Sequence, residues 1–436
     1  MLMSYAPLVL FGSFGVLMLI GVPIAFAIGV AAALTFMLFV GFDQSFFIVA
    51  QQMASGLDSF TLLAIPFFIL AGNIMNRGGI ARRLIDFGKV LGFALPGSLA
   101  HVNVLANMMF GALSGSAVAS AAAVGGVMAP LQKKEGYDPA FSAAVNISSC
   151  TTGLLIPPSA TFIVFSLITG GTSVAALFVA GYVPGILMGV GIMIVAGIIA
   201  KKRGYPTQPR PSGSEFVKKG LDALLPLGLV IVVMGGIIGG IFTATEASAI
   251  AVVYTLLLAF VWYRETSIKQ LPSIILESAV TTAVVLLMIG CSIAMSRAMA
   301  FGNIPNMISS YMLGLTDNPI MILLIINLVL LVVGTFMDMT PALLIFTPIL
   351  MPVVEKLGMD PVQFGVMMTL NLCVGICTPP VGSALFIGCS VGGTTIPKVL
   401  KPLIPFFLTL IAVLMLVTYI PAISLALPRL LLGYGS

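Results

Sequence analysis

The chain has 436 residues, of which 59% are apolar and 8% are charged, with a formal net charge of +5. A soluble domain carries about 25% charged residues, so this composition excludes an ordinary water-soluble enzyme and indicates a protein surrounded by lipid. The excess of cations is typical of the cytoplasmic loops of membrane proteins, and we assign it no nucleic-acid partner.

The first apolar segment follows a start that lacks the basic flank and cleavage site of a signal peptide, so we expect a retained membrane span. Five cysteines lie within apolar segments and have no zinc-site spacing. They indicate packing, and we expect no disulfide framework, no transition metal and no organic cofactor.

A helical hairpin is predicted at about residues 98–131. Basic residues between 77 and 89 precede it, and Lys133 and Lys134 follow it, so both of its ends should face the cytoplasm. The segment between these cations has no Asp, Glu, Lys or Arg, and Ser114-Gly115-Ser116 lies near its centre. A segment that leaves one side of the membrane and returns to it must turn in the middle, so we place the tip of the hairpin at these three small residues.

A broken helix is predicted next, at about residues 139–166. Its interruption is the pair Pro157-Pro158, which removes backbone donors and clashes with the preceding turn. In lipid, the freed backbone groups must be satisfied by protein, ligand, ion or water. Residues 140–200 contain no Asp, Glu, Lys or Arg and would extend about 90 Å as one helix, so they must cross a membrane of about 30 Å more than once.

Residues 201–219 are predicted to be a cytoplasmic linker, because they hold six of the nineteen cations together with several Pro and Gly residues. The linker divides the chain into an N-terminal half, residues 1–200, and a C-terminal half, residues 220–436. A shift of 222 residues aligns the two halves without gaps and superimposes four prolines within one window of 43 residues. The chain is therefore interpreted as an internal duplication.

The second half repeats the plan, with a hairpin at about 318–354 and a helix at about 361–388 that is broken at Pro379-Pro380. Asp338 lies at the tip of this hairpin. A carboxylate within the membrane is costly and usually functional, and here it suits a cation site, although it could instead cap a hairpin helix. Glu246 ends an uncharged run and is interpreted as a structural cap.

Paired interruptions in corresponding places of two halves indicate a transporter binding site near the middle of the membrane. Exposed carbonyls and hydroxyls can replace the hydration shell of a sodium ion, and helix N-termini favour anions. We therefore expect sodium as the coupling ion, at a first site made of Ser114, Ser116, Thr152, Gly153 and Pro157. The second sodium site is expected at Gly334, Thr335, Asp338, Gly375 and Thr378.

The substrate is expected to contact Arg297, Thr151, Ser159, Thr340, Pro158 and Pro380. Arg297 ends an apolar run and could pair with a substrate carboxylate, but an interfacial arginine that snorkels to water is an alternative. The small residues of both clusters could also serve ordinary helix packing.

The order of several segments resembles the large membrane subunit of the tripartite ATP-independent periplasmic (TRAP) transporters. The residues that carry the resemblance are Leu57 to Phe60, Ile65 to Gly72, Met75 to Ile80, Ser114 to Ser116, Ile156 to Ser159, Thr243 to Ala247 and Thr378 to Pro380. Ala244 stands where the family commonly has proline, which affects local rigidity more than the assignment.

The resemblance implies a multi-pass protein of the bacterial inner membrane that takes up an organic acid with sodium. It implies a periplasmic substrate-binding protein and a separate small membrane subunit of about four helices as partners. It also implies an all-α fold of two inverted repeats, with a scaffold and a transport domain that moves like an elevator. The pattern is similar to the sialic-acid branch, and C4-dicarboxylates are the alternative substrates.

Other functions were weighed against this one. An ion-coupled anion transporter that needs no binding protein belongs to the same broad class. An intramembrane enzyme is disfavoured, because one histidine cannot form a HExxH motif and Asp338 has no second acid for an aspartyl dyad. A passive channel is disfavoured because paired broken helices suit alternating access.

Overall fold

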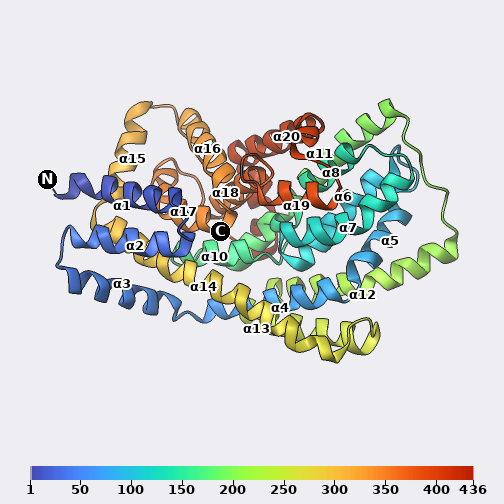
Figure 1. Ribbon diagram of the computed structural model, residues 1–436, viewed down its shortest axis with the longest axis horizontal. Coiled ribbons are helices and arrows are strands. Elements are labelled where there is room, and N and C mark those ends of the chain that lie inside the picture. The colour runs from blue at the N-terminus through green and yellow to red at the C-terminus, as the bar shows by residue number, and fades with distance from the viewer. Residues whose placement is uncertain (1, 436) are drawn as a thin grey trace.

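The structure is a computed structural model that describes residues 2–435, and within this range it contains helices and no strand (Figure 1). Eight of the described helices are long and apolar enough to cross a membrane, or up to nine if a bent pair counts as one span. Helices satisfy their own backbone hydrogen bonds, which lipid cannot do. The prediction of an all-α polytopic membrane protein is confirmed.

One group of helices, which we call the outer layer, follows the lower edge of the molecule in Figure 1. The long helix α14 packs against α2, α3 and α4, and α13 packs against α4. At the start of α13, Thr243 and Glu246 form a reciprocal capping box, so Glu246 is the structural cap that the sequence predicted. The layer comprises α1 (Leu2–Leu19), α2 (Ile24–Met37), α3 (Phe42–Leu57), a 3₁₀ turn (Phe60–Leu63), α4 (Ala64–Arg77), α12 (Gly213–Ile238), α13 (Ala244–Leu256), a π-helical turn (Leu257–Trp262), a 3₁₀ turn (Ile268–Gln270) and α14 (Leu271–Phe301).

The remaining helices form what we call the hairpin body. Two shorter helices join it to the outer layer, α5 (Ile80–Gly92) and α15 (Ile304–Leu315), which lie toward opposite ends of the molecule in Figure 1. The body itself contains α6 (Ser98–Ser114), α7 (Ala117–Lys134), α8 (Pro139–Ser149), α9 (Thr152–Leu155), α10 (Ala160–Ile168), α11 (Val174–Arg203), α16 (Pro319–Phe336), α17 (Met339–Lys356), α18 (Pro361–Gly375), α19 (Ser383–Val391), α20 (Ile396–Tyr419) and α21 (Pro421–Leu432).

The two hairpins are α6 with α7 and α16 with α17. Both second arms are 18 residues long, and they begin 222 positions apart. The helices that follow, α8 and α18, each begin at a proline, after Asp138 and Asp360, whose side chains accept hydrogen bonds from the first turn. The chain then breaks at Pro157-Pro158, with a bend of 51° between its two helical parts, and at Pro379-Pro380.

The predicted linker at 201–219 is shorter in the structure than the charge pattern indicated. Lys201 to Arg203 form the last turn of α11, and α12 begins at Gly213, so the non-helical segment is 204–212. The physical reason is that charged residues do not stop a helix. The Ser212 hydroxyl accepts a hydrogen bond from Glu215 N, and Lys219 pairs with Glu215 one turn on, so α12 starts in the polar region.

Glycine pairs allow each hairpin to approach its broken helix at backbone distance. A Cβ atom added to Gly111 in α6 would lie 2.5 Å from the Cα atom of Gly153 in α9. In the second half, a Cβ atom added to Gly375 would lie 2.6 Å from the Cα atom of Gly334. Such close crossings of membrane helices require residues without a side chain at the contact.

A buried polar cluster joins α6, α7 and α8. Asn107 Nδ2 lies 2.9 Å from Asn103 Oδ1, 3.0 Å from Asn146 Oδ1 and 2.7 Å from Ser149 Oγ. The hydroxyl of Ser120 donates to Asn107 Oδ1. All five side chains are shielded from solvent, so each depends on its neighbours for hydrogen bonds.

Replacing Asn107 with alanine should therefore destabilise the protein by about 2 kcal/mol, because each buried polar group that is left without a hydrogen-bond partner costs about 1–3 kcal/mol. The measurement is the thermal unfolding midpoint in detergent, followed by the reaction of a fluorescent maleimide with the five buried cysteines. Asn306→Ala is the matched control, since that asparagine is exposed. An equal midpoint for the two variants would contradict the role of the cluster.

Candidate functional site

The first hairpin turns at three residues between α6 and α7. Gly115 adopts a left-handed conformation with φ +61°, and Ser116 is extended and accepts a hydrogen bond from Ala119 N at the start of α7. A Cβ atom added to Gly115 would lie 3.7 Å from the carbonyl oxygen of Pro158. The first tip therefore lies against the break of the first broken helix, as the expected sodium site requires.

The hydroxyls around this break are buried. Thr151 donates to Ser148 O and Thr152 donates to Ser149 O, so both are used within their own helix. Ser159 is fully buried, and its hydroxyl has no hydrogen-bond partner among the described residues. Among the predicted substrate contacts, Ser159 thus has a hydroxyl that makes no hydrogen bond within the described chain and could bond to a ligand.

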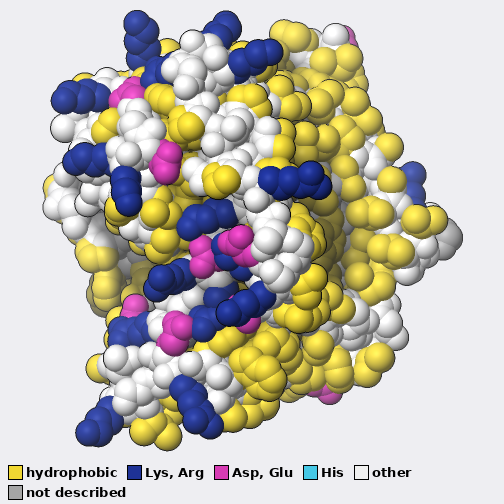
Figure 2. Space-filling model, turned by 90° about the vertical axis from the view of Figure 1, so that its right-hand side faces the viewer, with side chains coloured by type: hydrophobic (Ala, Val, Ile, Leu, Met, Phe, Trp, Pro, Cys, Tyr) yellow, Lys and Arg dark blue, Asp and Glu magenta, His cyan; other side chains and the backbone are white. Residues whose placement is uncertain are grey.

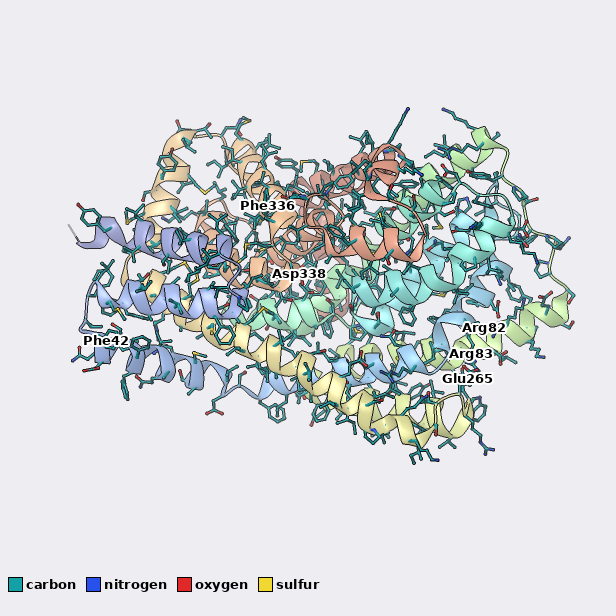
Figure 3. All side chains as sticks on the ribbon, viewed as in Figure 1. Phe42, Arg82, Arg83, Glu265, Phe336 and Asp338 are labelled. Atoms are coloured by element: carbon teal, nitrogen blue, oxygen red, sulfur yellow. The ribbon has the colours of Figure 1, made fainter. Side chains whose placement is uncertain are left out.

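The second hairpin turns at Met337 and Asp338. Asp338 occupies the N-cap position of α17, but its carboxylate makes no capping hydrogen bond. It instead accepts a hydrogen bond from Ser383, whose hydroxyl lies 3.3 Å from Asp338 Oδ1. No cation within residues 2–435 forms an ion pair with it. Figure 3 shows Asp338 near the centre of the molecule, below Phe336. The structure therefore does not support the capping alternative for Asp338.

A small cavity of about 30 Å³ adjoins this carboxylate. It is lined by Gly334, Met337, Asp338, Ile376, Val381, Gly382 and Ser383. The carbonyl oxygen of Thr335 nearby accepts a hydrogen bond from Val381 N, and Thr378 donates its hydroxyl to Val374 O. A space of this size suits one or two waters or a small ion. Ser383 contributes its hydroxyl to the wall of this cavity.

A larger cavity of about 160 Å³ lies between the two tips, and we call it the central cavity. Ser116 borders it from the first tip, and Asp338 and Thr340 border it from the second. The helices α4, α10, α14 and α19 complete the wall through Ile69, Thr161, Val285 and Ser383, among others. Segments that are more than 200 residues apart in the sequence thus meet at one space.

A third space of about 650 Å³ adjoins the central cavity, and we call it the wide cavity. The two share Ile69, Gly115, Ser116, Val118 and Ala160 on their walls. At its other end the wide cavity reaches Asn76 and Glu277, and Glu277 is paired with Arg77 at 2.8 Å. The wide cavity therefore leads from the tips toward the end of the molecule where Arg77 lies.

That end of the molecule is strongly cationic. Figure 2 shows that Lys and Arg side chains outnumber the Asp and Glu side chains among them on this face, with apolar surface beside them. Figure 3 places Arg82, Arg83 and Glu265 there, and Arg83 is paired with Glu265. Cations are concentrated on the cytoplasmic side of membrane proteins, so the wide cavity faces the cytoplasm.

Arg297 lies in a different cavity, of about 510 Å³, that we call the distal cavity. Its lining residues include Gln52 and Ser55 of α3, Leu167 of α10, Leu344 of α17 and Ser292 of α14. No lining residue is common to the distal and central cavities within the described chain. The expected grouping of Arg297 with Thr340 and Pro158 is therefore not what the fold produces.

One face of α14 borders all three of these cavities in turn. Glu277 and Thr281 border the wide cavity, Val285 the central cavity, and Ser292 and Ser296 with Arg297 the distal cavity. The five positions before Arg297 recur at helical spacing and share one side of the helix, whereas Arg297 directly follows Ser296 and lies about 100° further around the helix. Sequence reasoning missed this face, although polar residues at such intervals along an apolar helix were a signal for it.

The other predicted residues are distributed as follows. Ser114 and Pro158 line the wide cavity, and Thr340 lines the central cavity. Ser116 lines both the wide and the central cavity. The backbone of Thr151 instead contacts the second broken helix, with Cys373 Sγ 3.6 Å from Thr151 O. Residues that line none of the cavities described here are Thr151, Thr152, Gly153, Pro157, Ser159, Thr335, Gly375, Thr378 and Pro380.

Comparisons with known proteins show which proteins this chain is similar to. Residues 11–423 match the family model described as the DctM component of the tripartite ATP-independent periplasmic transporter. The chain is 55% identical to the uncharacterized protein YgiK of Salmonella typhimurium, with 98% of each chain covered. It is 39% identical to the sialic acid TRAP transporter large permease protein SiaM of Vibrio cholerae, over 98% of this chain and 99% of the relative.

A further relative is named for a different substrate. The chain is 40% identical to the C4-dicarboxylate TRAP transporter large permease protein DctM of Pseudomonas aeruginosa, over 92% of this chain and 94% of the relative. Among solved structures, the YdaH transporter of Alcanivorax borkumensis matches with a TM-score of 0.61 at 13% identity, over 88% of this chain and 89% of that one. This last likeness concerns the fold.

Proposed function

The chain belongs to the DctM-component family of the tripartite ATP-independent periplasmic transporters, and from this premise we propose that it couples the inward movement of sodium to the uptake of an organic acid. It is a large permease subunit of a family of organic-acid transporters, a multi-pass protein of the bacterial inner membrane, and not an enzyme. The proposal adds the coupling ion, the sites and the route.

One observation carries the proposal: the tips of two hairpins, each near its own broken helix, border a single central cavity. The second tip carries the carboxylate of Asp338, which has no cationic side chain as partner among the described residues. A carboxylate within a membrane protein needs a counter-charge. We propose that a sodium ion supplies it, in the small cavity that Asp338 shares with Gly334 and Ser383.

The first sodium ion is proposed at Ser114, Ser116 and the break near Gly153, where backbone oxygens and hydroxyls can replace hydration water. The organic acid is proposed to occupy the central cavity. The helices α7 and α17 begin at Ala117 and Met339 on the wall of this cavity, and helix N-termini favour anionic groups.

The route follows from the cavities that adjoin the tips. The central cavity adjoins the wide cavity across a shared wall, and the wide cavity leads toward the cationic, cytoplasmic end. Leu167 and Leu344 lie on the opposite side, where the distal cavity begins. We propose that this arrangement is the one from which substrate is released inward, and that the hairpin body, two inverted repeats, moves past the outer layer like an elevator to load on the other side.

The family implies a substrate-binding protein and a small membrane subunit, and we propose both as separate partners of this chain. Sialic acid is the proposed substrate, in line with the name of one relative, and a C4-dicarboxylate is the alternative, in line with another. A transporter that works without a binding protein would have the same tips, so the partner requirement has to be measured directly.

The test is uptake of radiolabelled sialic acid into proteoliposomes that contain this chain and its small membrane subunit. Accumulation should require the cognate binding protein outside and an inward sodium gradient. Potassium in place of sodium is the control for ionic strength. Equal uptake without sodium would refute the ion sites, equal uptake without the binding protein would indicate a stand-alone transporter, and uptake that never exceeds the external concentration would indicate a channel.

A further inference from the structure

The distal cavity combines a free cation, several hydroxyls and an apolar wall. We infer that it is a loading subsite for a monoanionic, hydroxylated organic acid, separate from the central cavity and occupied before the acid reaches the hairpin tips. This inference rests on the proposed function in assigning the acid as a substrate, but the site itself can be tested without transport.

Arg297 supplies the positive charge. Its Nε atom lies 3.4 Å from Gln52 Oε1, and no ion pair or further hydrogen bond of its guanidinium occurs within residues 2–435. The two terminal nitrogens are therefore free to bind a carboxylate through two parallel hydrogen bonds. No acidic residue lines the distal cavity in the described chain, so nothing there competes with an anionic ligand.

Ser292 provides an independent sign of a ligand. Its side chain is 3% exposed and lines the cavity one turn and a half before Arg297 on α14, yet its hydroxyl has no hydrogen-bond partner within the described residues. A buried polar atom without a partner is uncommon in a folded protein. The Ser292 Oγ atom is shielded from solvent as it stands, so a rotation of the side chain about Cα–Cβ would be needed for a bound acid to satisfy it.

The rest of the wall indicates the class of acid. Gln52, Ser55, Ser59 and Ser296 place an amide and three more hydroxyls on the side formed by α3 and α14. Leu167, Ile168 and Leu344 face them from the hairpin body. A ligand with hydroxyls along one edge and a carbon skeleton along the other complements both sides, as a sugar acid does.

The number of charges indicates one carboxylate. Among the described residues that line the wide, central and distal cavities, Arg297 is the one cation, whereas Glu277 and Asp338 are acids. A dicarboxylate in the distal cavity would leave its second carboxylate without a positive partner, and an unpaired charge in a partly desolvated site is costly. The distal cavity should therefore discriminate against C4-dicarboxylates.

The position of the cavity suits loading. It lies at the opposite end of the α14 face from Glu277 and the cationic surface, and the apolar side chains of Leu167 and Leu344 lie on its border toward the central cavity. In the present arrangement an acid at Arg297 would thus be held on the far side of the protein from the cytoplasm, next to the space that it has to enter.

The experiment measures protection of an introduced cysteine. Ser55→Cys places a thiol on the exposed wall of the distal cavity, and the five native cysteines are buried and give a low background. The full chain with its small membrane subunit is labelled by a maleimide in nanodiscs, with sialic acid, D-gluconate or succinate added. We expect sialic acid and D-gluconate to slow labelling in a saturable manner and succinate to have little effect.

In the double variant Ser55→Cys with Arg297→Gln, the acid concentration that gives half-maximal protection should rise by roughly 10-fold or more, because a charge-assisted pair is lost. Arg297→Lys should restore part of it. Arg429→Gln is the matched control, an exposed arginine of α21 that lines none of the three cavities.

Labelling that no acid slows, or protection that survives Arg297→Gln, would overturn the subsite. Protection by succinate as strong as that by D-gluconate would overturn the restriction to one charge. Sodium-driven uptake is measured on the same preparation. Protection without any uptake would support the subsite and refute the proposed function. Uptake without protection would support the proposed function and refute the subsite.

Discussion

Asp338→Ala should abolish sodium-driven accumulation of the organic acid. The carboxylate lies at the second hairpin tip beside a small cavity, and no cationic side chain in the described chain neutralises it. If a sodium ion does so, removing the carboxylate removes the one formal negative charge that the described residues place on that cavity wall. Loss of such a charge partner costs about 3–5 kcal/mol, which corresponds to a decrease in ion affinity of at least about 100-fold.

The measurement is the sodium concentration that gives half-maximal uptake into proteoliposomes. Asp338→Asn keeps the shape without the charge and should be as defective as alanine, and Asp338→Glu should retain part of the activity at high sodium. Asp317→Ala is the control, because Asp317 is exposed just before α16, outside the tip. An Asp338→Asn protein with wild-type sodium dependence would refute the second ion site.

Gly111→Val should destabilise the protein more than any other single change discussed in this article. A Cβ atom at this position would lie 2.5 Å from the Cα atom of Gly153 and 3.1 Å from its backbone nitrogen. Both obstacles are backbone atoms of the first broken helix, which cannot rotate away as a side chain could. Overpacking typically costs about 1–3 kcal/mol, and we expect a loss of at least about 3 kcal/mol here.

The matched control is Gly126→Val in α7, where an added Cβ atom meets nothing within 4 Å. Both changes place a β-branched residue in a hairpin helix, so their helix propensities cancel. We expect Gly111→Val to be recovered poorly from the membrane and to unfold at a much lower temperature than Gly126→Val. Similar unfolding temperatures would mean that α6 and α9 can move apart, and would contradict the close crossing.

The positions where the chain turns and breaks follow from local chemistry. Ser116 caps α7 because a short hydroxyl side chain can accept a hydrogen bond from the first turn, and Pro157 and Pro158 cannot continue a helix. The uncharged composition requires helices, since lipid leaves no other way to satisfy the backbone. These features depend on residues close together in the sequence.

The grouping of side chains around the cavities depends on distant residues. Arg297 was expected beside the tips, but α14 is long enough to carry it past the central cavity to the distal cavity. Thr151 was expected to face substrate, but its carbonyl contacts Cys373 of the other broken helix. Helical periodicity tells which residues share a face, and does not tell which neighbour that face meets.

The sequence by itself determined the membrane class, the family, the helical breaks and the position of Asp338 at a hairpin tip. Only the tertiary structure decided that Ser383 contacts Asp338, that α14 borders three cavities, and that the central cavity adjoins a wide cavity on its cytoplasmic side. The physical reason is that breaks and caps arise from interactions within a few residues, whereas cavities are the spaces left when helices far apart in the chain pack together.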